Sequence, residues 1–420
     1  MPRHEINRRR FLRAGLAAGA VVMAEPRLGS HALSFGATSY EPGSLAAAAP
    51  AYVAALEQRR LAPVKVSRDR LIRTVVGLRP YRSEGFVVEP EKLGEKLLVH
   101  NYGHGGAGVT LSWGTASLAV DLARDFIQTA RQPRRPQSRW RGVARTNSRN
   151  FHPAFAVLGC GVSGLSTARL LQQRFPDGTA NVTIYAKALP PDTTSNIAGA
   201  SWYPSSVFDP EAVTARFSEQ FQTACKISHR AFQTLVGPEF GVRWIETYEL
   251  IQNEASLRHE MLCGAELYPQ QQSYREAQSY FGFPYTHQYT TMLIEPHTYL
   301  RALLRDFYIA GGKVVVREFA TREEVARLRE PLVFNCTGLG SRALFNDEKL
   351  IPVRGQLEVL LPQPEIDYCY LAGSGYMFPR RDGIILGGTW QHENWNLQPD
   401  PAITTRLLDA HAEIMKAAQQ

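Results

Sequence analysis

Cysteine is scarce in this sequence, and its few positions are not arranged for metal binding. Five cysteines occur in 420 residues, and none forms a C-x-x-C pair or lies at a His-paired spacing. This excludes a recognisable zinc site or disulfide framework, and we expect no metal. The odd count favours free, mostly buried thiols at Cys160, Cys225, Cys263, Cys336 and Cys369.

Long apolar runs are also lacking. The candidate stretch Ala14–Ala24 is too short for a permanent membrane span, but it follows the basic motif Asn7-Arg-Arg-Arg-Phe-Leu-Arg13. This layout predicts a signal peptide over residues 1–24, and the paired arginines resemble the twin-arginine type. We expect the export machinery to deliver the protein to a periplasmic or extracellular location. The alternative is an uncleaved basic arm on a cytoplasmic protein.

Acidic residues are fewer than lysines and arginines, which gives a formal net charge of +8. The arginines concentrate in the first 15 residues and in 131–141, and the rest of the chain is close to neutral. We therefore expect no nucleic-acid partner. With 44% apolar residues, a chain of this length is expected to bury a large core and to form two domains.

The segment Phe155–Gly164 reads as a strand, a tight turn and the start of a helix. Its glycines have the spacing G-x-G-x-x-G: Gly159 allows the turn, Gly161 lets the backbone approach a pyrophosphate, and Gly164 lets helix and strand pack closely. Apolar residues then recur at helical spacing, and 181–185 reads as a second parallel strand. This context favours dinucleotide binding over a structural turn.

A second glycine-rich loop, Asn101–Thr110, follows the predicted strand 96–100. Four glycines within six residues do not fit a helix or strand interior, and they favour a backbone that lies against a ligand. The next segment, 111–126, has a broadly apolar helical face, so the positive end of a helix is expected beside the loop. A flexible linker is the alternative interpretation.

The remaining elements follow the same reasoning. We expect strands at 70–76, 242–251, 313–316 and 332–338, helices at 216–235 and 296–310, aromatic-rich turns around 278–289, and antiparallel strands over 353–391 before a final helix through Met415.

Taken together, these motifs resemble the D-amino-acid oxidase family of FAD enzymes over nearly all of residues 68–412. The resemblance is carried by Gly77-Leu-Arg-Pro80, His100-Asn-Tyr-Gly-His-Gly-Gly106, the fingerprint, Thr193–Gly199, Asn335–Gly338, Arg354-Gly-Gln356, Tyr376-x-x-Pro379 and Leu386-Gly-Gly388. It implies an α/β fold with a Rossmann-like FAD-binding domain and a second α+β substrate domain built on an antiparallel sheet.

The order of the motifs departs from the family. There, the elements matching Gly77–Pro80 and His100–Gly106 close the chain, whereas here they come first, so the sequence resembles a circular permutation. A rearranged, composite sequence is the alternative. The expected segments are a signal peptide (1–24), an N-terminal extension (25–67), a permuted segment of both domains (68–126), a linker (127–150), the FAD-binding domain with the fingerprint (151–206), mainly substrate domain (207–295), FAD-binding domain (296–350) and substrate domain (351–420).

The resemblance also implies the substrate site. Arg79 matches the family's clamp for the substrate carboxylate, Tyr376 its second carboxylate donor, and the carbonyl of Gly106 accepts from the substrate amine. Read without the resemblance, Arg79 is a surface arginine and Tyr376 a core tyrosine. His104 is a candidate base, but in this motif it is expected to order the loop.

On the cofactor side, the resemblance assigns residues along the whole of FAD. They are Gly159, Gly161, Gly164, Thr194, Ser195, Gly199, Ala200 and Ser201, with Phe319 and Thr337 near the adenosine half and Gly105, Gly108, Val109 and Thr110 near the flavin. One expected residue is missing, because Ala186-Lys187-Ala188 offers no acid to the ribose. We expect weaker or different adenosine anchoring, with Lys187 reaching a phosphate.

The expected reaction is oxidation of a neutral D-amino acid by hydride transfer to flavin N5, with O2 as the second small-molecule partner. The short segment 371–376 leaves no room for a long lid, and Trp390 stands where a cation would favour an acidic substrate. The alternatives are a glycine- or sarcosine-type oxidase or dehydrogenase and a non-catalytic flavoprotein. A homodimer is left open.

Overall fold

The computed structural model describes residues 61–131, 154–175, 181–253, 262–276 and 279–418. The predicted signal peptide and most of the predicted extension and linker lie outside these residues. Residues 60–420 form one compact unit that contains all the elements named below.

A mostly parallel sheet forms the first layer. Its strand order is β2-β3-β10-β4-β5-β9, and every neighbouring pair is parallel except β2 with β3. The strands are β2 (Val87–Leu93), β3 (Lys96–Tyr102), β4 (Ala154–Leu158), β5 (Asn181–Ala186), β9 (Lys313–Val316) and β10 (Leu332–Asn335). Phe155 to Leu158 are fully buried, as expected for a central strand covered on both faces.

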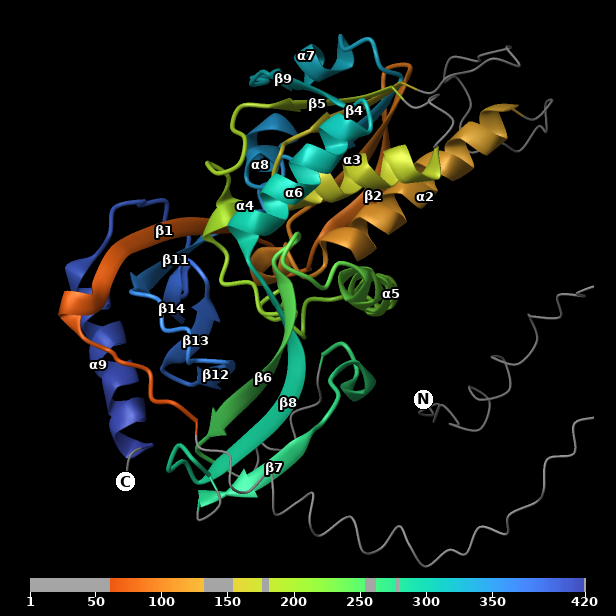
Figure 1. Cartoon of the computed structure of the whole chain (residues 1–420). Helices are drawn as coiled ribbons and strands as arrows, with labels where there is room; N and C mark the ends of the chain where they lie inside the picture. Colours follow the sequence, from red (N-terminus) through yellow and green to blue (C-terminus); the bar gives the residue numbers. More distant parts are fainter. Residues whose placement is uncertain (1–60, 132–153, 176–180, 254–261, 277–278, 419–420) are drawn as a thin grey trace, which may run out of the picture. The chain divides into compact units, whose positions relative to one another are not determined.

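Helices cover both faces of this sheet. On one face lie α2 (Ser112–Arg131) and α3 (Val162–Arg174), against which α5 (Ala215–Thr234) and α6 (Pro296–Ile309) pack, as Figure 1 shows. The short helices α7 (Arg322–Ala326) and α8 (Gly340–Leu344) add Val325 and Leu344 to the core on the other face. Helix α2 runs into the predicted linker at 127–150, because Ile127 is buried and extends its apolar face.

A second, nine-stranded sheet follows the order β1-β11-β14-β13-β12-β6-β8-β7, with β15 beside β11. All its pairs are antiparallel except β12 with β6, which confirms the expected fold class. Helix α9 (Pro401–Ala417) packs on β11, β13 and β14. The strands are β1 (Leu71–Tyr81), β6 (Val242–Ile251), β7 (Gln272–Arg275), β8 (Tyr285–Ile294), β11 (Ile351–Leu360), β12 (Tyr368–Ala372), β13 (Gly375–Arg380), β14 (Gly383–Gly387) and β15 (Gln391–His392).

Strand β8 corrects one prediction. The sequence predicts aromatic-rich turns around 278–289, and Tyr280 and Phe281 do lie in a turn. From Tyr285 the prediction is wrong, because β8 begins there and pairs with β6 along its whole length. Tyr289 is fully buried, so it belongs to the core of a strand.

The cysteines correct a second prediction. Cys225 on α5 and Cys263 form a disulfide across 38 residues of sequence. Cys160, Cys336 and Cys369 are free and buried, in agreement with the prediction for those three. The pairing depends on how the loop after β6 folds back onto α5, which cysteine spacing alone does not reveal.

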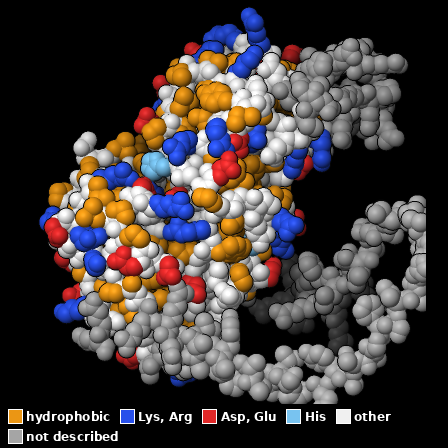
Figure 2. Space-filling view, in the orientation of Figure 1, with side chains coloured by type: hydrophobic (Ala, Val, Ile, Leu, Met, Phe, Trp, Pro, Cys, Tyr) orange, Lys and Arg blue, Asp and Glu red, His pale blue; other side chains and the backbone are white. Residues whose placement is uncertain are grey.

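Acidic and basic side chains are interspersed on the visible face of the described residues (Figure 2), rather than gathered into one basic patch. None of the described helices combines the length and apolar character that a membrane crossing requires.

The two ends of the described chain lie against each other. The Val64 N–H lies 3.2 Å from the sulfur of Met415, and the hydroxyl of Tyr368 donates to the carbonyl of Ala62 at 2.8 Å. Leu61 and Val64 are buried in the same cluster as Met415, near the end of α9. We propose on this ground that the chain is a circular permutation whose original connection ran from the end of α9 into β1.

Restoring that connection tests the proposed permutation. A chain that runs from residue 154 to 418, then through a short Gly/Ser linker into 61–131, retains every described contact. We expect its circular dichroism spectrum to match the natural chain and its unfolding midpoint to lie within about 5 °C. A control chain opened within β11, between Gly355 and Gln356, is expected not to fold. Failure of the first chain to fold would contradict the proposal.

Candidate functional site

A cavity of about 720 Å³ opens at the carboxyl ends of the parallel strands and reaches across to the second sheet. It is lined by the segments that follow β4, β5, β9 and β10, and by residues of β1, β13 and the loop after β14. Ligands of doubly wound sheets bind at this edge, and the volume is typical of a small-molecule site.

The cavity brings together nearly all the residues that the sequence singles out. Those that line it are Arg79, Gly105, Gly106, Gly108, Val109, Thr110, Gly159, Gly161, Lys187, Thr194, Ser195, Gly199, Ala200, Ser201, Phe319, Thr337 and Tyr376. Gly164 is absent from the lining. A Cβ there would lie 2.0 Å from the carbonyl oxygen of Gly159, so its role is the close packing of α3 on the turn. The individual binding roles stay predictions.

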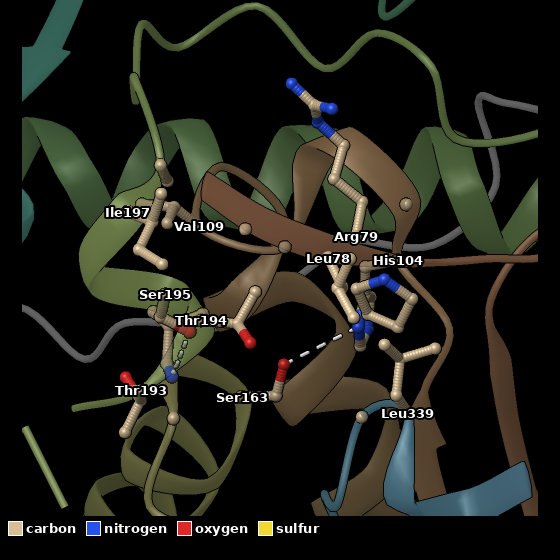
Figure 3. Close-up of a pocket in the computed structure, with 18 of the residues that line it drawn as sticks. Leu78, Arg79, His104, Val109, Ser163, Thr193, Thr194, Ser195, Ile197 and Leu339 are labelled. Atoms are coloured by element: carbon tan, nitrogen blue, oxygen red, sulfur yellow. Dashed lines mark hydrogen bonds between the residues drawn. The ribbon is translucent and has the colours of Figure 1, made fainter. Parts of the chain in front are cut away.

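The fingerprint turn has the backbone that its glycines predict. Gly159 has φ +103°, and a Cβ there would lie 2.4 Å from the Cys336 carbonyl oxygen. Helix α3 starts directly afterwards, and its first N–H group, that of Val162, donates to the hydroxyl of Ser195 at 3.0 Å. The turn and the Thr194–Ser195 segment therefore form one polar wall, seen in the lower part of Figure 3.

The second glycine loop is held against the segment after Ser201. The Gly106 N–H donates to the Ser206 carbonyl at 3.0 Å, and Gly105 has φ +56° with no room for a Cβ beside the same oxygen. The loop leads into α2, so the positive end of that helix lies at the cavity wall beside Val109 and Thr110.

His104 is buried within this loop and bonded on both ring nitrogens. Its Nε2 lies 3.1 Å from both Asn101 Oδ1 and Thr115 Oγ1, and its Nδ1 lies 3.5 Å from Ser163 Oγ (Figure 3). Burial lowers the pKa of His104 to about 4. The ring is therefore neutral at pH 7 and ties the loop to α2 and α3.

Arg79 extends toward the far end of the cavity, away from Thr193 to Ser195 (Figure 3). Its Nη1 donates to the carbonyl of Thr389 at 3.2 Å, and its guanidinium carbon lies 5.2 Å from the centre of the Trp390 ring. Within the described residues, no carboxylate lies at ion-pair distance from it. By contrast, Arg73 on the same strand pairs with Asp382 at 2.9 Å.

Two glycines create the room in which Arg79 and Tyr376 lie. A Cβ at Gly355 would lie 2.2 Å from Arg79 Nη1, and a Cβ at Gly387 would lie 2.3 Å from the Tyr376 ring. The Tyr376 ring stacks on Phe378, and its hydroxyl has no hydrogen-bond partner among the residues that the structure places. The guanidinium without a carboxylate partner and the free hydroxyl donor are the chemistry that a small carboxylate requires, and the role of Arg79 and Tyr376 in binding one stays a prediction.

At the opposite end of the cavity, Lys187 Nζ lies 3.0 Å from Glu318 Oε1. The contact of Lys187 with a phosphate of FAD stays a prediction. Phe319 packs edge-on against Tyr185 and lies under the guanidinium of Arg317. The Thr337 hydroxyl donates to Asn335 Oδ1 at 2.7 Å, which leaves mainly its backbone to face a ligand.

Several residues that line the cavity were not predicted from the sequence. Gly355 sits inside a recognised motif, but only the pairing of β1 with β11 reveals that it faces Arg79. Tyr203 and Glu318 also line the cavity, and nothing in their local sequence indicates this. For Gly355, the information that was missing is the register between β1 and β11, which are far apart in the sequence.

A cavity at the edge of a doubly wound sheet, with this glycine turn, defines a nucleotide-binding protein. The chain belongs to the family described as FAD dependent oxidoreductase, which matches residues 6–122 and 154–419. The gap in that match, 123–153, contains the whole of the predicted linker.

Curated relatives agree with this assignment. The chain is 32% identical over 267 residues to a D-amino-acid oxidase of Rubrobacter xylanophilus, which covers 60% of this chain and 74% of the relative. It is 30% identical over 257 residues to a human D-aspartate oxidase, covering 60% and 73%. It is 28% identical over 274 residues to a D-amino acid oxidase of Dugesia ryukyuensis, covering 63% and 78%.

The cofactor is FAD, and the residues present fit it. The glycine turn and the start of α3 suit its pyrophosphate, and Ala200 has φ +65°, a conformation that non-glycine residues rarely adopt. The buried Ser201 hydroxyl lines the cavity without a partner among the described residues. An orphaned buried donor of this kind is expected where a ligand completes the site.

The room beside Arg79 yields a direct prediction. In Gly355→Ala the new methyl group displaces the guanidinium. We expect the binding of a small carboxylate to weaken at least ~10-fold, because charge-assisted hydrogen bonds are lost. Changes in the visible spectrum of the flavin measure this binding. Gly373→Ala is the matched control, because a Cβ there meets open space. Equal carboxylate binding in both variants would contradict the assignment of the anion site to Arg79.

Proposed function

We propose that the protein oxidises neutral D-amino acids to imino acids, which hydrolyse to 2-oxo acids and ammonia, while O2 is reduced to hydrogen peroxide. The observation that carries this proposal is that the unpaired guanidinium of Arg79 and the free Tyr376 hydroxyl line one cavity, which also contains the FAD fingerprint. Two relatives are named as D-amino acid oxidases, which supports the same reaction.

In the proposed reaction, Arg79 binds the substrate carboxylate in a bidentate manner and Tyr376 donates a further hydrogen bond. The carbonyl of Gly106 accepts from the amine, which fixes the Cα hydrogen toward the flavin. FAD, when bound, supplies the hydride acceptor and the link to O2. Orientation then provides most of the catalysis, and no strong base is required.

His104 does not serve as that base in this proposal. Its pKa of about 4 would leave it unprotonated, but both ring nitrogens face Asn101, Thr115 and Ser163 rather than open space. Its part is to hold the glycine loop, and therefore Gly106, in position.

The proposed substrates are D-amino acids with neutral side chains, because the Arg79 end of the cavity carries no second cation among the described residues. The described cations that line the cavity are Arg79, Lys187 and Arg317, and the last two follow β5 and β9 at the other end. Trp390 covers the Arg79 guanidinium and presents an apolar surface. An acidic side chain would lose its hydration there without gaining a partner.

Two alternatives lead to different results. A glycine- or sarcosine-type oxidase or dehydrogenase shares the fold and would prefer an unsubstituted or N-methylated amine. A non-catalytic flavoprotein would bind FAD and carboxylates without turnover. The free donors at Arg79 and Tyr376 favour a catalytic site over the second alternative.

Turnover of a substrate panel tests the proposal. We expect peroxide and 2-oxo acid from D-alanine and larger neutral D-amino acids, and little from D-aspartate, glycine or sarcosine. Arg79→Lys should lower kcat/KM by about 30- to 150-fold, because lost bidentate pairing costs about 2–3 kcal/mol. Arg73→Lys, an exposed arginine on the same strand, is the control. Preference for sarcosine, or full activity in Arg79→Lys, would refute it.

We also propose that the protein is exported through a twin-arginine-like signal at residues 1–24. The Cys225–Cys263 disulfide supports this, because such bonds persist in oxidising compartments. A chain that folds and binds FAD before export suits that route.

Fractionation of the producing cell tests export. We expect exported protein to lack the N-terminal segment and to show three titratable thiols after unfolding, those of the free cysteines. Replacing Arg8 and Arg9 together by Lys should retain the protein inside the cell, whereas Arg3→Lys should not. A full-length protein with five thiols inside the cell would contradict the proposal.

A further inference from the structure

The end of β5 lacks the acid that binds ribose hydroxyls in many dinucleotide-binding sheets. Ala186, Lys187 and Ala188 occupy that position, and all three line the cavity. A carboxylate is therefore needed from elsewhere if the adenosine ribose is to be recognised in the same way.

The neighbouring strand supplies one. Strands β5 and β9 are parallel, with Ala186 opposite Val316, and the Arg317 N–H donates to the Ala186 carbonyl at 3.0 Å. This register carries the chain after β9 along the same edge as the end of β5. Glu318 follows Arg317 there and lines the cavity.

Lys187 pairs with the Glu318 carboxylate. Lys187 Nζ lies 3.0 Å from Glu318 Oε1, and Oε2 has no hydrogen-bond partner among the described residues. The side chains are 69% and 67% exposed, so the pair contributes little to folding stability. An ionised carboxylate accepts several hydrogen bonds, and the lysine uses only one oxygen.

The surroundings of Glu318 suit an adenosine. Phe319 lines the cavity next to it and offers an aromatic face, whose other contacts are Tyr185 and the guanidinium of Arg317. Arg317 is thus directed toward the Phe319 ring, and Lys187 toward Glu318.

We propose that Glu318, oriented by Lys187, accepts hydrogen bonds from the adenosine ribose hydroxyls of FAD and so replaces the missing acid at the end of β5. The carboxylate then comes from the segment after β9 rather than from the end of β5, but both positions lie at the same edge of the sheet. This inference concerns cofactor binding and does not depend on which amine is oxidised.

The affinities of the natural chain and its variants for FAD and for two FAD analogues test this role. Apoprotein is titrated with FAD and with FAD analogues that lack the 2′- or the 3′-hydroxyl of the adenosine ribose, and binding is followed by flavin fluorescence. We expect the natural chain to bind FAD about tenfold more tightly than at least one analogue. Glu318→Ala should weaken FAD binding by about the same factor and should bind FAD and that analogue equally.

Further variants separate this role from a structural one. Glu318→Gln keeps the shape and should show a smaller loss of FAD affinity, and Lys187→Ala a partial loss confined to FAD. Glu323→Gln, on nearby α7 and outside the cavity lining, is the matched control and should bind like the natural chain. Unchanged FAD affinity in Glu318→Ala, or an equal loss for FAD and both analogues, would overturn the proposal.

Discussion

A guanidinium that lies in a cavity without a carboxylate partner must be held by other contacts, and Arg79 is held in this way. The Thr389 carbonyl, the Trp390 ring and the space left by Gly355 fix its position without neutralising its charge. That end of the cavity therefore carries a positive charge without a carboxylate partner among the described residues, which is the basis of the anion site proposed there. The long pairing of β1 with β11 sets this geometry, because it places Gly355 against the Arg79 side chain.

The two sheets contribute different residues to the cavity that contains Arg79. The carboxyl ends of the parallel strands form the turn, the helix start and the Glu318–Lys187 pair that line one part of the cavity. The second sheet supplies Arg79 and Tyr376. In the proposed function, a substrate held by its carboxylate would lie between the second sheet and the flavin. Each sheet combines strands from before residue 131 with strands from after residue 153, so the order of segments along the chain matters less than their pairing.

Local sequence predicted much of the site, and tertiary structure decided the rest. The glycines of the fingerprint and of the 101–110 loop were recognisable because turns with positive φ, at Gly103, Gly105 and Gly159, and close packing, at Gly164, demand them. The disulfide between Cys225 and Cys263 and the ion pair of Lys187 with Glu318 were missed, because each joins segments that only the folded chain brings together. Strand β8 was missed because its first residues, from Tyr285, continue an aromatic-rich segment that begins as a turn at Tyr280 and Phe281.

The most direct test of the central claim is the visible spectrum of the purified protein before and after D-alanine is added without oxygen. The account predicts a yellow protein whose flavin band, at about 450 nm for flavins in general, bleaches with D-alanine and not with L-alanine. Bleaching by the D isomer alone would establish the cofactor, the reaction and the stereochemistry together. A yellow protein that neither isomer bleaches would contradict the claim that the unpaired Arg79 site presents D-amino acids to FAD.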